Sequence, residues 1–278
     1  MCEALEVSKN AFYNWLKDRQ SERKSFRKVL GYEIQKIYNL SDQSYGSPRI
    51  TIELEKIGYK VSRPLVAKIM FEQGLRSCLR PKFVVTTDSV HKLPIAENIL
   101  NREFQVNELG TVWVSDITYI RVNSDWVYLT TVIDLADRKV ISWCVSDDMT
   151  TENTVVKAWN KAINNRQIGE SLLFHSDRGV QYASNKFRRI LKFNKKVTQS
   201  MSRKGNCWDN AVAESFFKTI KHEKLNRYKF SSIEQVRQVV FEYIERWYNR
   251  MRIHSSLGYK TPLEKELELI ANKLKNVA

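Results

Sequence analysis

The sequence predicts an α/β protein in which a mixed β-sheet is flanked by helices, with an all-helical region before it and a helical extension after it. Three observations predict this class. Apolar residues recur at helical spacing up to about residue 80, β-rich runs separated by turns follow from Val106, and helical and strand patterns then alternate. A chain of 278 residues is long enough for about two domains.

The charge of the chain predicts a polyanionic partner. The 46 Lys and Arg against 31 Asp and Glu give a net charge of +15 and a pI of about 9.6. An excess of this size favours a nucleic acid as the partner. Ordinary surface charge for solubility is the alternative, and charge alone does not distinguish DNA from RNA or from an anionic membrane.

The cysteines and the first residues argue against a secreted or membrane protein. The four cysteines lie far apart and form no Cys-x-x-Cys pair, so we expect neither a disulfide framework nor a zinc site. The start lacks a basic segment followed by an apolar one, and no run of about 18 apolar residues occurs. These features predict a reducing compartment and no membrane span.

Residues 1–26 predict one helix, capped by Ser8, with Phe12 and Trp15 on its apolar face. Only a stub, residues 4–7, precedes this helix. The layout is that of a partial helix-turn-helix whose first helix is cut short. A short amphipathic helix packed on its neighbour is the alternative.

Residues 27–80 predict a more complete helix-turn-helix domain of three helices. Pro48 can open the second helix, Gly58 ends it, and the third helix begins after Ser62 with Pro64 just inside. The expected inner residues are Val29, Ile34, Ile37, Tyr38, Ile50, Leu54, Ile57, Val66, Ile69 and Met70. We expect Arg49, Ser62, Arg63 and Lys68 to face DNA, and residues 1–92 carry a net charge of +7. Helical trios without DNA contact are the alternative.

Residues 81–105 contain scattered Pro, Thr and Ser without periodicity, which predicts an extended linker. From residue 106 three β-rich runs form a meander, with turns at residues 123–124 and 136–137. A helix capped by Thr151, a short strand ending at Asp177, a basic helix and a further strand edge follow. We expect a core domain over residues 106–225 and a helical segment over residues 226–278.

Three acids fall where sites form in such sheets, at strand ends and helix starts. Asp116 lies among apolar neighbours in the first strand, Asp177 ends the fourth, and Glu214 lies in a helix capped by Asp209 or Asn210. A carboxylate in apolar surroundings costs several kcal/mol unless it is paired or bound to a metal. Three acids can hold two Mg²⁺ or Mn²⁺ ions about 3.5–4 Å apart, the arrangement that serves phosphodiester chemistry.

Spacing alone does not select these acids. Asp116 could pair with an arginine, Asp177 could cap the next helix, and Glu214 could be a solvated residue. Asp134 also lies in a strand, while Asp125 and Asp137 are turn residues.

Four segments together select the trio by their resemblance to a family. These are "WVSDITYI", "FHSDRGVQYAS", "SMSRKGNCWDNAVAESFFKTIKHE" and "YNRMRIHSSLGYKTP", which contain Asp116, Asp177, Glu214 and Tyr248–Pro262. At these residues the chain resembles insertion-sequence transposases of the OrfB type, whose core is similar to retroviral integrases and ribonuclease H. The resemblance covers nearly the whole chain and implies a ribonuclease H-like fold.

The resemblance also implies an activity. Asp116, Asp177 and Glu214 would hold two Mg²⁺ (or Mn²⁺) ions, nick the element ends and transfer the new 3′-hydroxyl to another phosphodiester. Terminal inverted repeats and target DNA would be the partners, in a dimer or larger assembly in the bacterial cytoplasm at the nucleoid. The product of an upstream reading frame is a further partner or fusion. The alternatives are an inactive DNA-binding regulator and a ribonuclease H-like nuclease without strand transfer.

Several residues around the trio are further DNA-contact candidates. Asn210, Lys218 and Lys221 share the helix face of Glu214, and residues 186–229 carry a net charge of +10. The full set in this domain is Arg178, Arg203, Lys204, Asn206, Trp208, Asn210, Lys218 and Lys221. Trp208 would either stack on a base or fill the core. His175 would support Asp177, touch a phosphate or serve the fold only.

Overall fold

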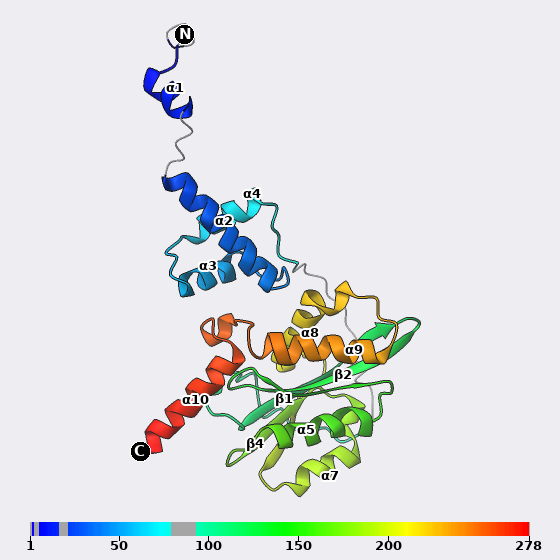
Figure 1. Cartoon of the computed structure of the whole chain (residues 1–278). Helices are drawn as coiled ribbons and strands as arrows, with labels where there is room; N and C mark the ends of the chain where they lie inside the picture. Colours follow the sequence, from blue (N-terminus) through cyan, green and yellow to red (C-terminus); the bar gives the residue numbers. More distant parts are fainter. Residues whose placement is uncertain (1, 3–5, 17–21, 79–92, 278) are drawn as a thin grey trace. The chain divides into compact units, whose positions relative to one another are not determined.

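The computed structural model (Figure 1) describes residues 2, 6–16, 22–78 and 93–277. The chain divides into two compact units, the first ending at Cys78 and the second beginning at Leu79. Across the described residues, no helix has both the length and the apolar character that a membrane span needs.

The first unit is helical. Its helices are α1 (Lys9–Leu16), α2 (Glu22–Leu40), α3 (Ser47–Lys56) and α4 (Arg63–Glu72). Ser8 caps α1 as predicted, because its Oγ accepts from the Ala11 amide at 3.4 Å. Pro48 lies in the first turn of α3, and Ser62 is the N-cap residue of α4. Of the expected stub of a first helix, residues 4–7, residues 4 and 5 lie outside the described residues, and Glu6 and Val7 are not helical.

The core of this unit differs from the prediction at two residues. Leu30, Ile34 and Tyr38 form the buried ridge of α2, whereas Val29 is 50% exposed. Residues four apart lie above one another on a helix, so Leu30 and not Val29 shares the face of Ile34. Ile57 is also exposed, because α3 ends at Lys56 and Ile57 is already in a non-helical conformation.

The second unit contains the mixed sheet. Its strands are β1 (Val112–Val122), β2 (Asp125–Asp134), β3 (Val140–Ser146), β4 (Leu172–Ser176) and β5 (Val197–Met201). The order is β3-β2-β1-β4-β5; β1 to β3 form the predicted antiparallel meander, and β4 and β5 join β1 in parallel. β1 therefore lies at the centre of the sheet with a neighbour on each side.

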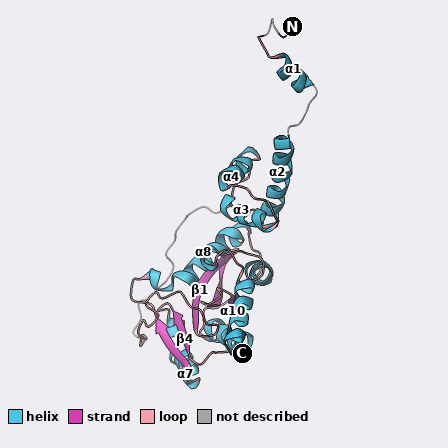
Figure 2. Cartoon of the chain, turned by 90° about the vertical axis from the view of Figure 1, so that its left-hand side faces the viewer, coloured by secondary structure: helices cyan, strands magenta, loops and turns pink. Residues whose placement is uncertain are grey.

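Helices cover both faces of this sheet (Figure 2). They are η1 (Glu152–Val156), α5 (Lys157–Asn165), α6 (Val180–Ala183), α7 (Asn185–Phe193), η2 (Cys207–Asn210), α8 (Ala211–Glu223), η3 (Leu225–Arg227), α9 (Ile233–Phe241), η4 (Glu242–Tyr248), η5 (Ser255–Leu257) and α10 (Pro262–Val277). Val114 and Ile120 of β1 pack with α8 and α9 in one core. Trp113 packs with α5, α6 and α7 in the other core.

Segments on both sides of the expected core domain complete these two cores. Leu93 and Ile95, at the end of the expected linker, pack against the α5–α7 core, and Leu100 is buried in the α8–α9 core. Val240 of α9 and Ile244 of η4, which we assigned to a separate C-terminal segment, lie in the α8–α9 core as well.

Two predicted N-cap residues make no capping bond with their side chains. Thr151 is the N-cap residue of η1 as predicted, but the capping bond comes from Thr150, whose Oγ1 accepts from the Asn153 amide; Asp148 binds both Thr150 and Asn153. Asn210 is the N-cap residue of α8, but neither its side chain nor that of Asp209 accepts a bond there. Both side chains have other partners, described below.

The outer edge of β3 is covered by side chains. Asn249 bonds both the amide and the carbonyl of Val140 at 3.0 Å, and Asn165 donates to the Ile141 carbonyl at 2.8 Å. Lys161 and Arg237 donate to the carbonyls of Trp143 and Val145. An edge whose carbonyls have such partners is a poor template for another strand.

Candidate active site

Asp116 lies in the middle of β1, paired across the sheet with Thr131 of β2. Alternate residues of a strand share a face, so Asp116 is on the side of Val114 and Ile120, under α8. Its carboxyl is half-buried, and Oδ1 accepts from the Ile117 amide at 2.8 Å. Burial raises the pKa of Asp116 well above its usual value, and the charges of Asp177 and Glu214 raise it further.

Asp177 comes next to Asp116 because β1 and β4 run parallel. Their last register pair is Ser115 with Ser176, so each strand places its acid one residue further on. The Oδ1 of Asp177 accepts from the Gly179 amide at 2.9 Å. A Cβ on Gly179 would lie 3.1 Å from this oxygen, whereas its φ of −58° is open to any residue. Gly179 is thus needed for space and not for a left-handed turn.

Glu214 lies in the first turn of α8 and is half-buried. Burial raises its pKa, and the charge of Asp177 raises it further. Each of the three acids therefore acts on another through its charge. The structure brings together at one end of the sheet three carboxyls that are 61 and 37 residues apart in the sequence.

The three carboxyls supply oxygen ligands only, the set that suits Mg²⁺ and Mn²⁺. Within residues 2, 6–16, 22–78 and 93–277, however, no group of three or more His, Cys, Asp or Glu is arranged to hold a metal ion as it stands. Two carboxylates about 4 Å apart repel by roughly 4 kcal/mol at intermediate dielectric, which favours separation. The carboxylate oxygens of the trio are thus suitable ligands for Mg²⁺ or Mn²⁺, but their side chains would have to rotate to bind one ion together. The metal role of the trio stays a prediction.

Lys221 is the basic residue of α8 that acts on the site. It is half-buried; burial lowers its pKa, whereas the charge of Asp116 raises it. Lys218, one turn earlier, is exposed. Lys221 and Asp116 therefore act on each other through their charges, and the contacts of Lys218 and Lys221 with DNA stay predictions.

The other predicted DNA contacts have varied environments. Lys204 is exposed and Trp208 is 68% exposed, so Trp208 does not fill the core. Arg178 and Asn206 are half-buried. In the first unit Ser62, Arg63 and Lys68 are exposed on α4, while Arg49 lies over the Tyr45 ring. Their contacts with DNA stay predictions.

The prediction that Asn210 contacts DNA is wrong, because its side chain is buried and cannot reach DNA. It is 2% exposed, and its Nδ2 donates to the Ser115 carbonyl at 3.0 Å. Its Oδ1 is buried without a hydrogen-bond partner among the described residues. The short turn η2 ends at Asn210 and directs this side chain toward β1 instead of along the outer face of α8.

Arg203 also has a structural role. Its guanidinium donates two hydrogen bonds to Asp209, which also accepts from Arg102 and Asn98. Arg203 first of all, with Arg102 in addition, lowers the pKa of Asp209. Asp209 thus anchors the loop before α8. The pairing with residues 98 and 102 bridges more than 100 positions, and no local pattern predicts it.

His175 serves the fold. It is fully buried, with Nδ1 at 2.9 Å from Ser200 Oγ and Nε2 at 3.3 Å from Ser202 Oγ. Burial lowers its pKa to about 4. A neutral, enclosed imidazole does not contact a phosphate.

The competing acids are structural as well. Asp134 and Asp137 are buried, and both form ion pairs with Arg166, at 3.0 and 2.8 Å. Asp125 is exposed at the turn between β1 and β2. The catalytic role of Asp116, Asp177 and Glu214 stays a prediction.

Sequence reasoning missed two residues beneath the trio. Ser115 and Tyr182 are buried, and their hydroxyl oxygens are 2.8 Å apart. Burial raises the pKa of Tyr182 well above its usual value, and the charges of Asp116 and Asp177 raise it further. The apolar surroundings of Tyr182 gave no signal, because the sequence "VQYAS" reads as an ordinary helix start.

The fold and this end of the sheet define the class of the protein. The integrase core domain family matches residues 107–207, a second integrase core domain family matches residues 195–262, and the HTH-like domain family matches residues 27–83. The protein is an integrase-core polynucleotidyl transferase of the DDE type, with a ribonuclease H-like sheet and a helix-turn-helix-like region.

The particular family follows from its relatives. The chain is 38% identical over 273 residues to the transposase InsF of insertion sequence IS3A from Escherichia coli strain K12, covering 98% of this chain and 94% of InsF. It is 37% identical over 262 residues to the uncharacterized 31 kDa protein of insertion element IS600 from Shigella sonnei, covering 94% and 96%. The chain belongs to the IS3 family of insertion-sequence transposases.

Among solved structures, the HTLV-2 integrase catalytic core in complex with magnesium matches with a TM-score of 0.42 and 17% identity. The match covers 56% of this chain and 94% of that one.

Proposed function

We propose that this transposase nicks DNA at the ends of its element and then joins the exposed 3′-hydroxyl to a second phosphodiester. The observation that supports this best is the electrostatic coupling of Asp116, Asp177 and Glu214 at one end of the sheet. Acids that raise one another's pKa in a half-buried site are suited to cations and to the phosphates that cations bind.

The three acids would hold two divalent ions, Mg²⁺ or Mn²⁺. When bound, such ions supply activation of the attacking oxygen and stabilisation of the leaving 3′ oxygen. In the first reaction a water oxygen forms a bond to phosphorus and the bond to the 3′ oxygen breaks. In the second reaction that 3′ oxygen loses its proton, forms a bond to a target phosphorus and displaces another 3′ oxygen.

The chain's own residues orient the acids and the DNA. The Ile117 and Gly179 amides fix one oxygen each of Asp116 and Asp177. Lys221 beside Asp116 would offset the charge of a phosphate in the site. Lys218, Lys204 and the exposed indole of Trp208 would contact the flanking DNA, through phosphates and by stacking.

The first unit would recognise the element ends. Ser62, Arg63 and Lys68 are exposed on α4, next to the turn that precedes it. This is the geometry of a recognition helix whose N-terminal residues contact bases. Two or more copies would hold two ends together in the bacterial cytoplasm at the nucleoid, with the product of an upstream frame as partner or fusion.

The test incubates the wild type and Asp116→Asn with labelled element ends, target DNA and Mg²⁺. New DNA–DNA joints from the wild type alone support the proposal. Hydrolysis without joints indicates a nuclease, and end binding without cleavage by either protein indicates an inactive regulator. Equal cleavage by both proteins removes Asp116 from the mechanism.

A further inference from the structure

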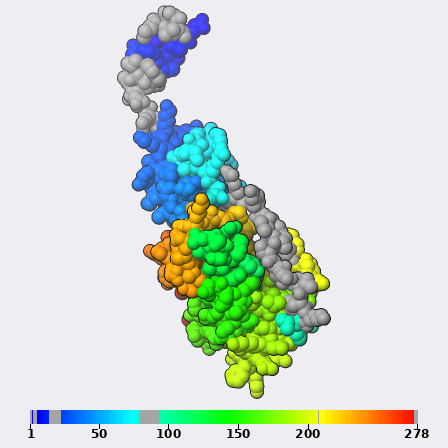
Figure 3. All heavy atoms as spheres, turned by 90° about the vertical axis from the view of Figure 1, so that its right-hand side faces the viewer, coloured from blue at the N-terminus to red at the C-terminus, as the bar shows by residue number. Residues whose placement is uncertain are grey.

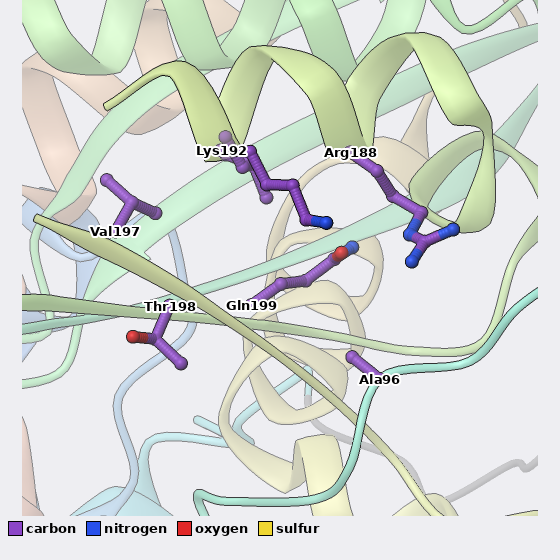
Figure 4. Close-up of a pocket in the computed structure, with 7 residues that line it drawn as sticks. Ala96, Arg188, Lys192, Val197, Thr198 and Gln199 are labelled. Carbon is purple, nitrogen blue, oxygen red and sulfur yellow. The ribbon is translucent and has the colours of Figure 1, made fainter. Parts of the chain in front are cut away.

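A hollow of about 290 Å³ lies between α7 and the edge strand β5, away from the acid trio (Figure 4). Arg188 and Lys192 line it from successive turns of α7, and Thr198 and Gln199 line it from β5. Figure 4 shows Arg188 and Lys192 extending from the helix toward the strand. None of the lining residues is acidic.

The segment around this hollow is strongly basic, although one of its lysines, Lys186, pairs with Glu152. Residues 185–197 contain six Lys and Arg and no acid, and Figure 3 shows this part of the chain, in yellow-green, at the surface of the second unit. Neither Arg188 nor Lys192 forms an ion pair with any of the described residues. By contrast, Arg166 and Arg252 are tied to buried acids. Like charges four residues apart on a helix destabilise it unless an anion lies between them.

We infer that this hollow binds a phosphodiester group of DNA outside the active site, so that a second stretch of the nucleic acid follows the α7–β5 edge. Arg188 would donate paired hydrogen bonds and Lys192 a point charge. Gln199 is fixed by its bond to the Tyr182 carbonyl at 2.9 Å, which leaves its oxygen for a sugar or a bound water. This site rests on the proposed function for its DNA partner.

The test measures binding of a labelled random-sequence DNA duplex against salt, in EDTA so that cleavage plays no part. Each lost phosphate contact lowers the slope of log K against log salt by about 0.9. We expect R188A/K192A to lower it by about 2. The control R246A/R250A removes two exposed arginines four residues apart, one in η4 and one in the turn after it, and should leave the slope unchanged.

Equal slopes for the wild type and R188A/K192A overturn the inference. Thermal unfolding with inorganic phosphate distinguishes a DNA site from a site for small anions. If phosphate raises the Tm of the wild type but not of R188A/K192A, and the DNA slopes of the two proteins are equal, the hollow binds small anions only. That outcome also overturns the inference. Failure of the wild type to bind DNA at all contradicts the proposed function instead.

A separate observation concerns Ser115, which joins the three acid-bearing segments. Its Oγ donates to the Thr131 carbonyl at 2.8 Å, so the Tyr182 hydroxyl must donate to that Oγ. The Ser115 carbonyl accepts from Asn210 at 3.0 Å. Ser115, Tyr182 and Asn210 are each at most 2% exposed.

Two of these bonds link β1, which carries Asp116, to the segments next to Asp177 and Glu214, and the third holds Ser115 on β2. Ser115 precedes Asp116 and points to the opposite face of β1, Tyr182 follows Asp177 by five residues, and Asn210 precedes Glu214 by four. The geometry points to Ser115, Tyr182 and Asn210 as positioning residues that keep the three carboxyls in reach of one another. This inference also rests on the proposed function.

The test compares Tyr182→Phe and Ser115→Ala with Tyr128→Phe, a half-buried tyrosine of β2, as control. The readouts are the Tm rise caused by Mg²⁺ and kcat and KM for a DNA end. We expect Tyr182→Phe to lower kcat about tenfold with little change in KM and to reduce the Mg²⁺-induced Tm rise, and Ser115→Thr to restore both relative to Ser115→Ala.

One outcome overturns the inference: the variants have a lower Tm in the absence of Mg²⁺, but their kcat and their Mg²⁺-induced Tm rise equal those of the wild type. The residues then only stabilise the fold. A wild type without any Mg²⁺-induced Tm rise contradicts the proposed metal site and not the positioning role.

Discussion

Two sets of three acids in the second unit differ in how their charge is compensated. Asp134, Asp137 and Glu266 surround Arg166, at 3.0, 2.8 and 2.7 Å. Asp116, Asp177 and Glu214 instead act on one another: the largest effect of a neighbouring charge on Asp116 comes from Asp177 and raises its pKa. For Asp134 that effect comes from Arg166 and lowers its pKa.

We interpret this difference in charge compensation as follows: the acids around Arg166 stabilise the fold, and the trio binds a ligand. Burial raises the pKa of Asp116 and Glu214 in one set and of Asp134 and Asp137 in the other, where that of Asp137 reaches about 6. Only the partner differs, and it decides which set is structural. Removing an acid from the Arg166 set should weaken the fold, whereas removing one from the trio should weaken catalysis and relieve repulsion.

The largest effect that we expect is the loss of catalytic activity in Asp116→Asn. The amide keeps the shape and removes the charge that a cation needs, so we expect DNA cleavage to fall at least about a thousandfold, or about 4 kcal/mol in activation free energy. End cleavage by purified protein measures it, with DNA binding as the control for folding.

Stability should change in the opposite direction in the same variant. Relief of like-charge repulsion should raise the free energy of unfolding by about 1 kcal/mol, as is common when a functional site is neutralised. A clear loss of stability in denaturant titration would place Asp116 with the structural acids.

Arg166→Met tests the set of acids that we consider structural. Arg166 is 6% exposed, and its loss leaves buried carboxylates without their cation, so we expect about 3–5 kcal/mol of destabilisation. Urea unfolding at neutral pH measures this, and Arg250→Met, at an exposed site, is the control. A change below about 1 kcal/mol would mean that water compensates these acids.

The pH dependence of stability in Asp209→Asn tests the ion pairs that Asp209 forms before α8. The pKa of Asp209 is lowered in the folded protein, so its stabilising effect is complete above the unfolded pKa of about 3.9 and is lost as pH falls below it. We expect the variant to lower the Tm at pH 7 by about 4 °C. The difference between the two Tm values should shrink steadily as the pH falls below about 4; a constant difference would contradict the ionic role.

The smallest expected effect is that of Gly179→Ala. The new Cβ would lie 3.1 Å from Asp177 Oδ1, so the carboxyl must shift by a few tenths of an ångström. We expect about tenfold slower cleavage, because small displacements of reacting groups are costly, with the stability nearly unchanged. Gly58→Ala, at a φ of +93° in the first unit, should show the reverse.

The sequence was sufficient for those parts of the fold that local patterns determine. The strands around Asp116, the turn at Asn123 and the helix start at Pro48 follow from residues close to one another. The trio needed the resemblance as well, because Asp134 lies in a strand as Asp116 does. Only the position of Arg166, 32 residues after Asp134, distinguishes the two acids.

What could not be predicted depends on distant or fine geometry. Asp209 is bound by Arg102 across 107 positions, and Asn210 by Ser115 across 95. Val29 and Leu30 are equally apolar, and only the rotation of α2 against α3 and α4 decides which is buried. At Gly179 the φ is open to any residue, and the constraint is the space beside the Asp177 carboxyl, which no sequence pattern reveals.

The covered border of β3 has a consequence for crowding. Several copies gathered on one piece of DNA would be present at high local concentration, where an open sheet border invites neighbours to stack into fibrils. With Asn249, Asn165, Lys161 and Arg237 bonded along that border, neighbouring copies are poorly placed to pair through β3, and their association would use other surfaces.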